Sequence, residues 1–128
     1  MAIYRAGTLL IPSGPSNDPE RKHLHVVCND TDANGFNLIV PVATWTNDLC
    51  DATCHLLAHD HDFLRHKSWV VYRNAAIVEA VRLETGINER LVIRHADMNN
   101  SAFLRVKNGI CRSPSTPRKI KTYFGCVL

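Results

Sequence analysis

The residues best suited to chemistry in this chain are basic side chains that lie beside aromatic ones. Arg65, Lys67 and Arg73, with His66 among them, surround Trp69 and Tyr72. Basic groups can hold phosphates, and aromatic rings can stack on unpaired bases. We therefore expect the three basic residues to contact RNA. A solvated basic face around aromatic core residues would give the same pattern and is the competing interpretation.

A second basic cluster follows a proline-rich segment near the N-terminus. Residues 12–19 contain three prolines and one glycine, a composition that forbids a continuous strand ladder and predicts a loop. Lys22, His23 and His25 come shortly after this loop. We expect these three side chains to add RNA contacts, with a solvated face again as the alternative.

Histidines and acidic residues are densest between residues 55 and 66. His55, His59, His61 and Asp62 could hold a divalent ion, because imidazole and carboxylate groups suit several metals. Their spacing matches no established zinc pattern, and the cysteines do not pair with them. The sequence therefore favours a solvated loop and no metal. A metal-dependent enzyme built on these four residues is a third hypothesis.

Cleavage of RNA without a metal or another cofactor needs three groups. A base activates the 2′-hydroxyl, an acid protonates the leaving oxygen, and a cation stabilises the charged phosphorane. Histidine, arginine, threonine and acidic residues can fill these roles, and the chain contains all of them. It has no P-loop or nucleophile-elbow glycine pattern, while Ser/His/Asp and Cys/His arrangements stay open.

The elements that must position these residues begin with strands. Apolar and β-branched runs predict strands over residues 6–11, 23–28, 36–40 and 69–72. The Asn34-Gly35 dipeptide is typical of a hairpin turn, so the second and third strands form the best-supported unit. Pro41 should end the third strand or place it at an edge.

Helices are expected later in the chain. Met98, Ala102, Val106 and Ile110 recur every fourth residue, which predicts an amphipathic helix that ends near Asn108-Gly109. Either Asp97 or Asn99 can cap its start. A short last helix should run from Thr116-Pro117 to Phe124. Residues 75–83 fit a buried strand and a buried helix equally well.

Strands first and helices late predict an α+β fold. We expect a small antiparallel β-barrel or sheet with one or two C-terminal helices packed against it. The length of 128 residues suits a single domain over 1–128, with a β-rich part over 1–96 and a helical part over 97–128.

Charge and cysteine content limit the possible partners and the cellular location. The net charge of +3 permits nucleic-acid binding without requiring it. Five irregularly spaced cysteines argue against a disulfide framework, and Cys28 and Cys111 look like buried thiols. The sequence shows no signal-peptide pattern and no apolar stretch long enough to cross a bilayer. We therefore expect a cytoplasmic protein with no membrane partner.

The order of these segments resembles the PemK/MazF-like toxin family. The resemblance rests on Arg21 before the 23–27 strand and on the run Leu38-Ile-Val-Pro-Val-Ala-Thr44, while residues 61–72 are similar to a barrel strand of relatives from mobile elements. It implies an SH3-like barrel and a metal-independent endoribonuclease that forms a homodimer and binds an antitoxin protein. It also implies catalytic roles for Arg21, as electrostatic stabiliser or acid–base group, and for Thr44.

Two function classes follow from these patterns. The leading hypothesis is a toxin-like barrel protein of a toxin–antitoxin system that binds and cuts RNA. The alternative is a non-enzymatic interaction module from a phage or mobile element. It is motivated by the missing Gly-x-Glu-Gln loop and by Lys22, which follows Arg21 where the family has proline.

Overall fold

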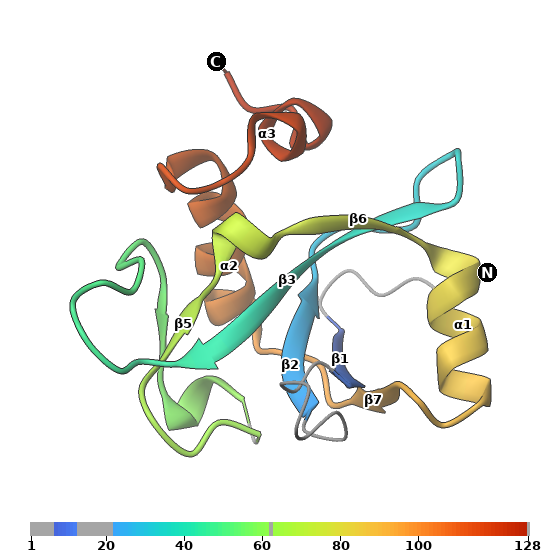
Figure 1. Ribbon diagram of the computed structural model, residues 1–128, viewed down its shortest axis with the longest axis horizontal. Coiled ribbons are helices and arrows are strands. Elements are labelled where there is room, and N and C mark those ends of the chain that lie inside the picture. Colours follow the sequence, from blue (N-terminus) through green and yellow to red (C-terminus); the bar gives the residue numbers. More distant parts are fainter. Residues whose placement is uncertain (1–6, 13–21, 62, 128) are drawn as a thin grey trace.

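The computed structural model describes residues 7–12, 22–61 and 63–127 (Figure 1). Its strands are β1 (Thr8–Pro12), β2 (Lys22–Val27), β3 (Phe36–Thr44), β4 (His55–Leu56), β5 (Ser68–Val70), β6 (Ala76–Glu79) and β7 (Ile93–His95). Its α-helices are α1 (Ala80–Asn88), α2 (Asn100–Arg112) and α3 (Arg118–Phe124), and single 3₁₀ turns cover Ala58–Asp60 and Tyr72–Asn74.

All seven strands join one antiparallel sheet. The order is β4-β5-β3-β2-β1-β7, and β6 pairs with β3 outside this path. The predicted α+β class with C-terminal helices is therefore confirmed. The two ends of the path, β4 and β7, are very short and do not pair with each other, so the described strands form an open sheet and not a closed barrel.

The predicted hairpin is present as β2 and β3, with Val26 opposite Val40. Its turn is held by Asp32, whose Oδ1 accepts the backbone N–H groups of Asn34 at 2.8 Å and Phe36 at 2.9 Å. Gly35 has a φ of 86°, a left-handed conformation that glycine adopts without a Cβ clash. The Asn-Gly dipeptide therefore forms the hairpin turn because Gly35 adopts the left-handed conformation that the turn requires.

The sequence suggested that Pro41 ends the third strand or places it at an edge, but β3 continues through Pro41 inside the sheet. Pro41 lies opposite His25 in the ladder, and its carbonyl accepts the N–H of Val71 at 2.9 Å. Proline lacks only the donor, so its carbonyl still bonds a neighbouring segment. The strand continues to Thr44, where Val42 pairs with Val70.

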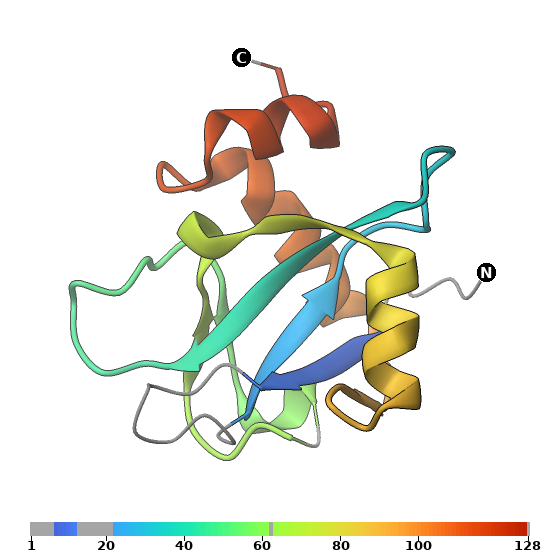
Figure 2. The ribbon, with the colours of Figure 1, turned by 45° about the vertical axis from the view of Figure 1, so that its right-hand side comes forward.

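Helices cover the two faces of the sheet, as Figures 1 and 2 show together. The larger core lies on the face covered by α2 and α3 and contains Leu24, Val40 and Val106. The smaller core contains Leu9, Val27 and Leu83 on the side of α1. Residues 75–83, which fitted strand or helix equally, contain both: β6 ends at Glu79 and α1 begins at Ala80.

Helix α2 confirms the four-residue apolar period. Ala102, Val106 and Ile110 are fully buried, and the side chain of Asn99 caps the helix by accepting the N–H of Ala102 at 2.8 Å. The helix continues past Asn108-Gly109, the predicted end, to Arg112. Gly109 is a contact position and not a terminator, because a Cβ there would lie 1.9 Å from the Tyr72 hydroxyl oxygen.

The cysteines divide differently from the expectation. Cys28 is buried, as predicted, but Cys111 is exposed and forms a disulfide with Cys126 that links α2 to the segment after α3. The spacing of the cysteines does not predict this pair. The two cysteines are 15 residues apart, and the fold of the chain through α3 brings them together. Among the described helices, none is long and apolar enough to span a membrane.

Replacement of Gly109 by alanine tests the contact with Tyr72. Alanine is normally about 1 kcal/mol better than glycine inside a helix. Here we expect Gly109→Ala to lower the free energy of unfolding by about 1–3 kcal/mol, because the new methyl group overpacks the site. Urea denaturation measures the change, with the exposed neighbour Asn108→Ala as control. A more stable Gly109→Ala protein would contradict the described packing.

Removal of the disulfide tests its contribution to stability. Closure of a loop of about 15 residues is worth about 3 kcal/mol at most in the chain-entropy account. We expect Cys126→Ser to lower the unfolding free energy by up to that amount, and Cys50→Ser, at a free thiol, to change it little. Mass spectrometry after alkylation of the unreduced, denatured chain should count three free thiols. Five alkylated thiols would contradict the bridge.

Candidate functional site

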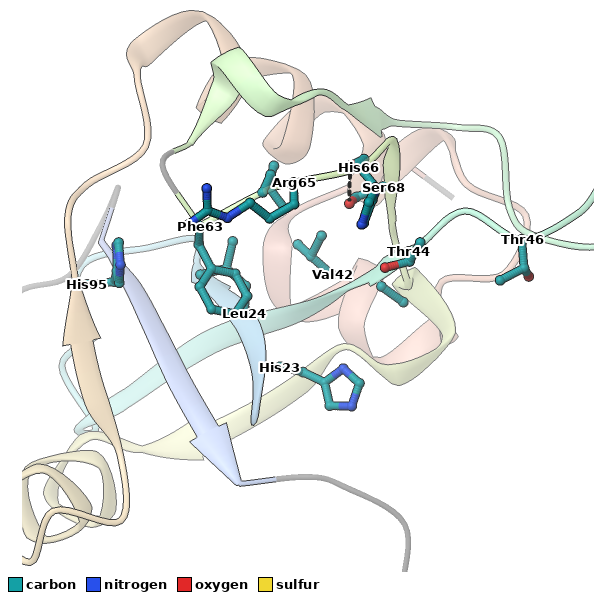
Figure 3. Close-up of a pocket in the computed structure, with 12 residues that line it drawn as sticks. His23, Leu24, Val42, Thr44, Thr46, Phe63, Arg65, His66, Ser68 and His95 are labelled. Carbon is teal, nitrogen blue, oxygen red and sulfur yellow. Dashed lines mark hydrogen bonds between the residues drawn. The ribbon is translucent and has the colours of Figure 1, made fainter. Parts of the chain in front are cut away.

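A cavity of about 570 Å³ lies at one end of the sheet (Figure 3). Its wall is made by β2, β3, β5, β7 and the segment before β5. The lining residues are His23, Leu24, Val42, Ala43, Thr44, Thr46, Phe63, Leu64, Arg65, His66, Ser68 and His95. We call it the histidine pocket, after His23, His66 and His95.

The pocket combines an apolar floor with polar groups at its rim. Leu24, Val42 and Leu64 are buried members of the main core, so the cavity opens directly above it. Arg65 and His66 are exposed at the rim. Apolar walls with a few convergent polar groups are typical of ligand sites, and the volume lies within their usual range of about 300–1,000 Å³.

Strand register brings the hydroxyl groups together. Thr44 and Ser68 are directly paired across β3 and β5, so their side chains share one face of the sheet and line the pocket. The Ser68 Oγ donates to the carbonyl of His66 at 2.9 Å, a bond drawn in Figure 3. This bond fixes the backbone from which Arg65 and His66 project.

The segment that carries Arg65 and His66 is anchored to helix α2 by an ion pair between the buried carboxylate of Asp60 and the exposed guanidinium of Arg105. Asp60, whose residue is 4% exposed, accepts from Arg105 Nη2 at 2.8 Å and from the N–H of Leu57 at 2.8 Å. The Asn99 side chain donates to the Asp60 carbonyl at 3.4 Å. Asp60 therefore supports the pocket wall from behind and does not face the cavity.

His61 connects the same segment to two strands. Its Nδ1 accepts the N–H of Phe63 at 3.1 Å, so Nε2 carries the proton that faces Thr8 Oγ1 at 3.0 Å and the Ala96 carbonyl. The Thr8 hydroxyl also donates to the Ala96 carbonyl at 2.7 Å. The His61 ring centroid lies 4.8 Å from that of His95. His61 thus positions Phe63 and His95, both of which line the pocket.

Three of the residues predicted from the sequence line this cavity: His23, Thr44 and Arg65. They come from three separate parts of the chain, which the fold brings to one place. Arg21 lies outside the described residues. Lys22 is the first residue of β2 and lies opposite Pro12 in the ladder.

His25, Lys67 and Arg73, which the sequence also predicted to contact RNA, do not line the histidine pocket. His25 is only 9% exposed, and its Nδ1–H donates to the carbonyl of His23 at 3.0 Å, so it offers little surface to a ligand. Lys67 Nζ lies 4.8 Å from the ring centroid of Trp45. The guanidinium carbon of Arg73 lies 5.9 Å from the ring centroid of Trp69.

His95, Thr46 and Ser68 line the pocket without having been chosen from the sequence as RNA-binding or catalytic residues, whereas His66 belongs to the basic cluster beside Trp69 and Tyr72. His95 belongs to a three-residue edge strand whose partner, β1, lies more than 80 positions earlier. No local sequence pattern predicts such a long-range strand pairing. The apolar run at residues 91–93 was the only local hint of a strand that could carry His95.

The histidine-rich segment does not assemble a metal site from its described members. His59 is exposed, His61 is engaged with Thr8 and Phe63, and the His55 ring lies edge-on to Trp45 at 4.6 Å. Asp62 lies outside the described residues. Within residues 7–12, 22–61 and 63–127, no group of three or more His, Cys, Asp or Glu side chains is placed to hold a metal ion.

The burial of His25 predicts a pH dependence of stability. Burial lowers its pKa from the ordinary 6.5, and nearby His23 lowers it further, against the opposing carbonyl bond. The unfolded chain therefore takes up a proton more readily, so stability is full above pH 6.5 and falls as the pH drops from there toward the folded pKa. Denaturation between pH 7.5 and 5 should show this loss, at most about 1.4 kcal/mol per pH unit for one proton. His25→Gln should reduce the slope, whereas His59→Gln should not. An equal slope in His25→Gln would contradict this assignment.

Comparison with known proteins gives no relative for this chain: no family model, curated protein or solved structure matches it. The resemblance to PemK/MazF-like toxins therefore stays a prediction. What the chain does has to be argued from the histidine pocket and its surroundings.

Proposed function

We propose that this protein binds single-stranded RNA in the histidine pocket and cleaves it without a metal ion. The observation that carries the proposal is that His23, His66 and His95 line the same cavity as Arg65. Imidazole titrates near neutral pH and can serve as base or acid. Guanidinium is always charged and binds phosphate oxygens through paired donors.

The chemistry would be an internal phosphoryl transfer. One histidine takes the proton of a ribose 2′-hydroxyl, and the resulting oxygen attacks the adjacent phosphorus. The bond from phosphorus to the 5′-oxygen breaks, and a second histidine gives that oxygen a proton. The products are a 2′,3′-cyclic phosphate and a free 5′-hydroxyl. Arg65 lies between His66 and His95 in Figure 3, a position suited to the negative charge of the phosphorane.

Thr44 fits this scheme as a binding group. Its exposed side chain stands at the rim of the pocket, and its hydroxyl can donate to a phosphate oxygen. Arg21 immediately precedes β2, whose second residue is His23. In the PemK/MazF-like reading Arg21 adds a second cation at the phosphate. The same resemblance also predicts an SH3-like barrel fold, a cytoplasmic location, a homodimer and an antitoxin protein as partner.

One surface favours the second function class, a non-enzymatic interaction module. Leu91 and Ile93 are 56% and 44% exposed, and Ile93 belongs to β7 at the edge of the sheet. Exposed edge strands pair readily with other chains. In a binding module this edge would carry the function, and the histidine pocket would hold no scissile phosphate.

Variants of the pocket test the nuclease proposal directly. Purified protein with excess EDTA should cleave long single-stranded RNA and leave 2′,3′-cyclic phosphate ends. We expect His95→Ala, His66→Ala and Arg65→Ala each to lower the cleavage rate by about 100-fold or more, the usual value of an acid–base group. Exposed His59→Ala and Arg118→Ala are the matched controls and should retain full activity.

Two results would reject the nuclease. One is RNA that stays intact with the parent protein, and the other is full activity in all three pocket variants. Filter binding then separates the remaining classes. RNA binding without cleavage would leave an RNA-binding protein, whereas no affinity even at about 50 mM salt, where phosphate contacts are strong, would favour the interaction module.

A further inference from the structure

Phe63 is an exposed aromatic residue in the wall of the histidine pocket, and the proton transfers of the proposed reaction give it no role. It is 36% exposed, and within the part of the chain that the structure describes it belongs to neither apolar core. It lines the same cavity as Arg65, His66 and His95. An apolar ring beside charged and titratable groups suits a ligand that has a planar part and an anionic part.

The contact with His95 leaves at least one face of the Phe63 ring uncovered. The two ring centroids lie 6.0 Å apart, and the ring planes are inclined at 70°. In such an edge-to-face contact one ring presents its edge to the other, so His95 covers at most one face of Phe63. Figure 3 shows the Phe63 ring between His95 and Val42, in the wall of the cavity.

The Phe63 ring also carries no cation, in contrast to three other aromatic rings of the protein. Lys67 lies over Trp45, Arg73 over Trp69 and Lys107 over Phe103. Among the described residues, no lysine or arginine occupies the corresponding position over Phe63. A ligand therefore has no side-chain cation to displace before it can stack on this ring.

The backbone holds Phe63 and Arg65 on either side of a buried residue. Leu64, between them, is 7% exposed and packs in the main core. The N–H of Phe63 donates to His61 Nδ1 at 3.1 Å, and the N–H of Leu64 donates to the His61 carbonyl at 3.1 Å. These contacts fix the segment, so an aromatic ring and a guanidinium group are held two positions apart in one wall.

A nucleotide with an unpaired base has the two parts that this wall can bind. Bases stack on aromatic side chains through their faces, and a guanidinium group binds phosphate oxygens. A base inside a duplex is covered on both faces by its neighbours and has none to offer. The buried side chains of Leu24 and Val42 line the cavity too, so a base that enters it also leaves water for an apolar surface.

We propose that Phe63 is the stacking platform for one unpaired base, that of the nucleotide whose phosphate is bound by Arg65. The base lies against the uncovered face of the ring, and the phosphate contacts the guanidinium group. The choice of RNA as ligand rests on the proposed function. Because stacking uses the face that every base has, the platform accepts all four bases and selects for single strands.

The platform holds the base equally in the bound substrate and in the transition state. Loss of such uniform binding raises KM and leaves kcat unchanged. We therefore expect Phe63→Leu to raise the KM for single-stranded RNA by about 10-fold with kcat close to that of the parent. The proposed acid–base histidines should behave in the opposite way, because their loss lowers kcat.

Titration with adenosine 3′-monophosphate and with inorganic phosphate tests the platform independently of cleavage. NMR shifts of the backbone amides of residues 63–68 report binding. The parent protein should bind the nucleotide more tightly than phosphate. Phe63→Leu, which keeps an apolar side chain without a ring, should weaken nucleotide binding by about 10-fold and leave phosphate binding unchanged. Phe63→Trp should retain nucleotide binding, and Arg65→Leu should weaken the binding of both ligands.

Leu104→Ala on α2 is the control for loss of an exposed apolar side chain, since Leu104 is 53% exposed, and should change neither affinity. Absence of nucleotide binding, equal affinity of the parent for nucleotide and phosphate, or nucleotide affinity that Phe63→Leu leaves unchanged would overturn the platform. An equal loss in Phe63→Leu and Phe63→Trp would overturn it too, because any aromatic ring should serve.

The same variants separate this proposal from the nuclease. Nucleotide binding that depends on Phe63, together with RNA that stays uncleaved, would support the platform and reject the nuclease. Cleavage of single-stranded RNA by Phe63→Leu with the KM of the parent would keep the nuclease and reject the platform.

Discussion

The arrangement of this molecule depends on the pairing of β3 along its whole length. Its first four residues pair with β6, the middle residues 39–41 pair with β2, and its last three residues pair with β5. Leu38, Val40 and Val42 place one face of the strand in the main core, so its direction is fixed by burial. Thr44, the last residue of β3, reaches the rim of the histidine pocket. A one-residue slip of β3 would remove the apolar side chains from the core and the threonine from the pocket together.

The wall opposite β3 is held by polar groups instead. Asp60 and Arg105 pair across the gap between a single 3₁₀ turn and helix α2, and the carboxylate is almost completely buried. The Arg105 side chain is 45% exposed, so the pair adds little net stability, but loss of Arg105 would leave the buried carboxylate without its cation. Such a pair therefore specifies where the segment sits more than how stable the fold is. His61 acts in the same sense, since each ring nitrogen has a defined partner and leaves one tautomer for the neutral ring.

Local sequence signals predicted the elements that local physics determines. The Asn34-Gly35 turn, the period of α2 and the end of α3 at Phe124 all follow from neighbouring residues, and each is present. Helix α3 begins at Arg118 with Pro117 as its N-cap, one residue later than the start predicted from Thr116-Pro117. Elements defined by distant partners were missed. β7 forms only because β1 is beside it, and residues 75–83 split into strand and helix because β3 offers a pairing edge only as far as Phe36, opposite Glu79. The same limit applied to the site: His23 and Arg65 could be chosen by residue type and Thr44 by the family resemblance, while His95 and the Cys111–Cys126 bridge required the tertiary fold.

Helix α2 holds two chain segments that contribute to the histidine pocket. Arg105 pairs with the buried Asp60 in the segment before β5, and Ser113, which follows α2 directly, donates to Asp51 in the loop after β3 at 2.5 Å. Thr46 at the start of that loop and Arg65 before β5 both line the pocket. The position of a phosphate bound there would therefore depend on the packing of α2 against the sheet, which supplies the fixed geometry that catalysis requires.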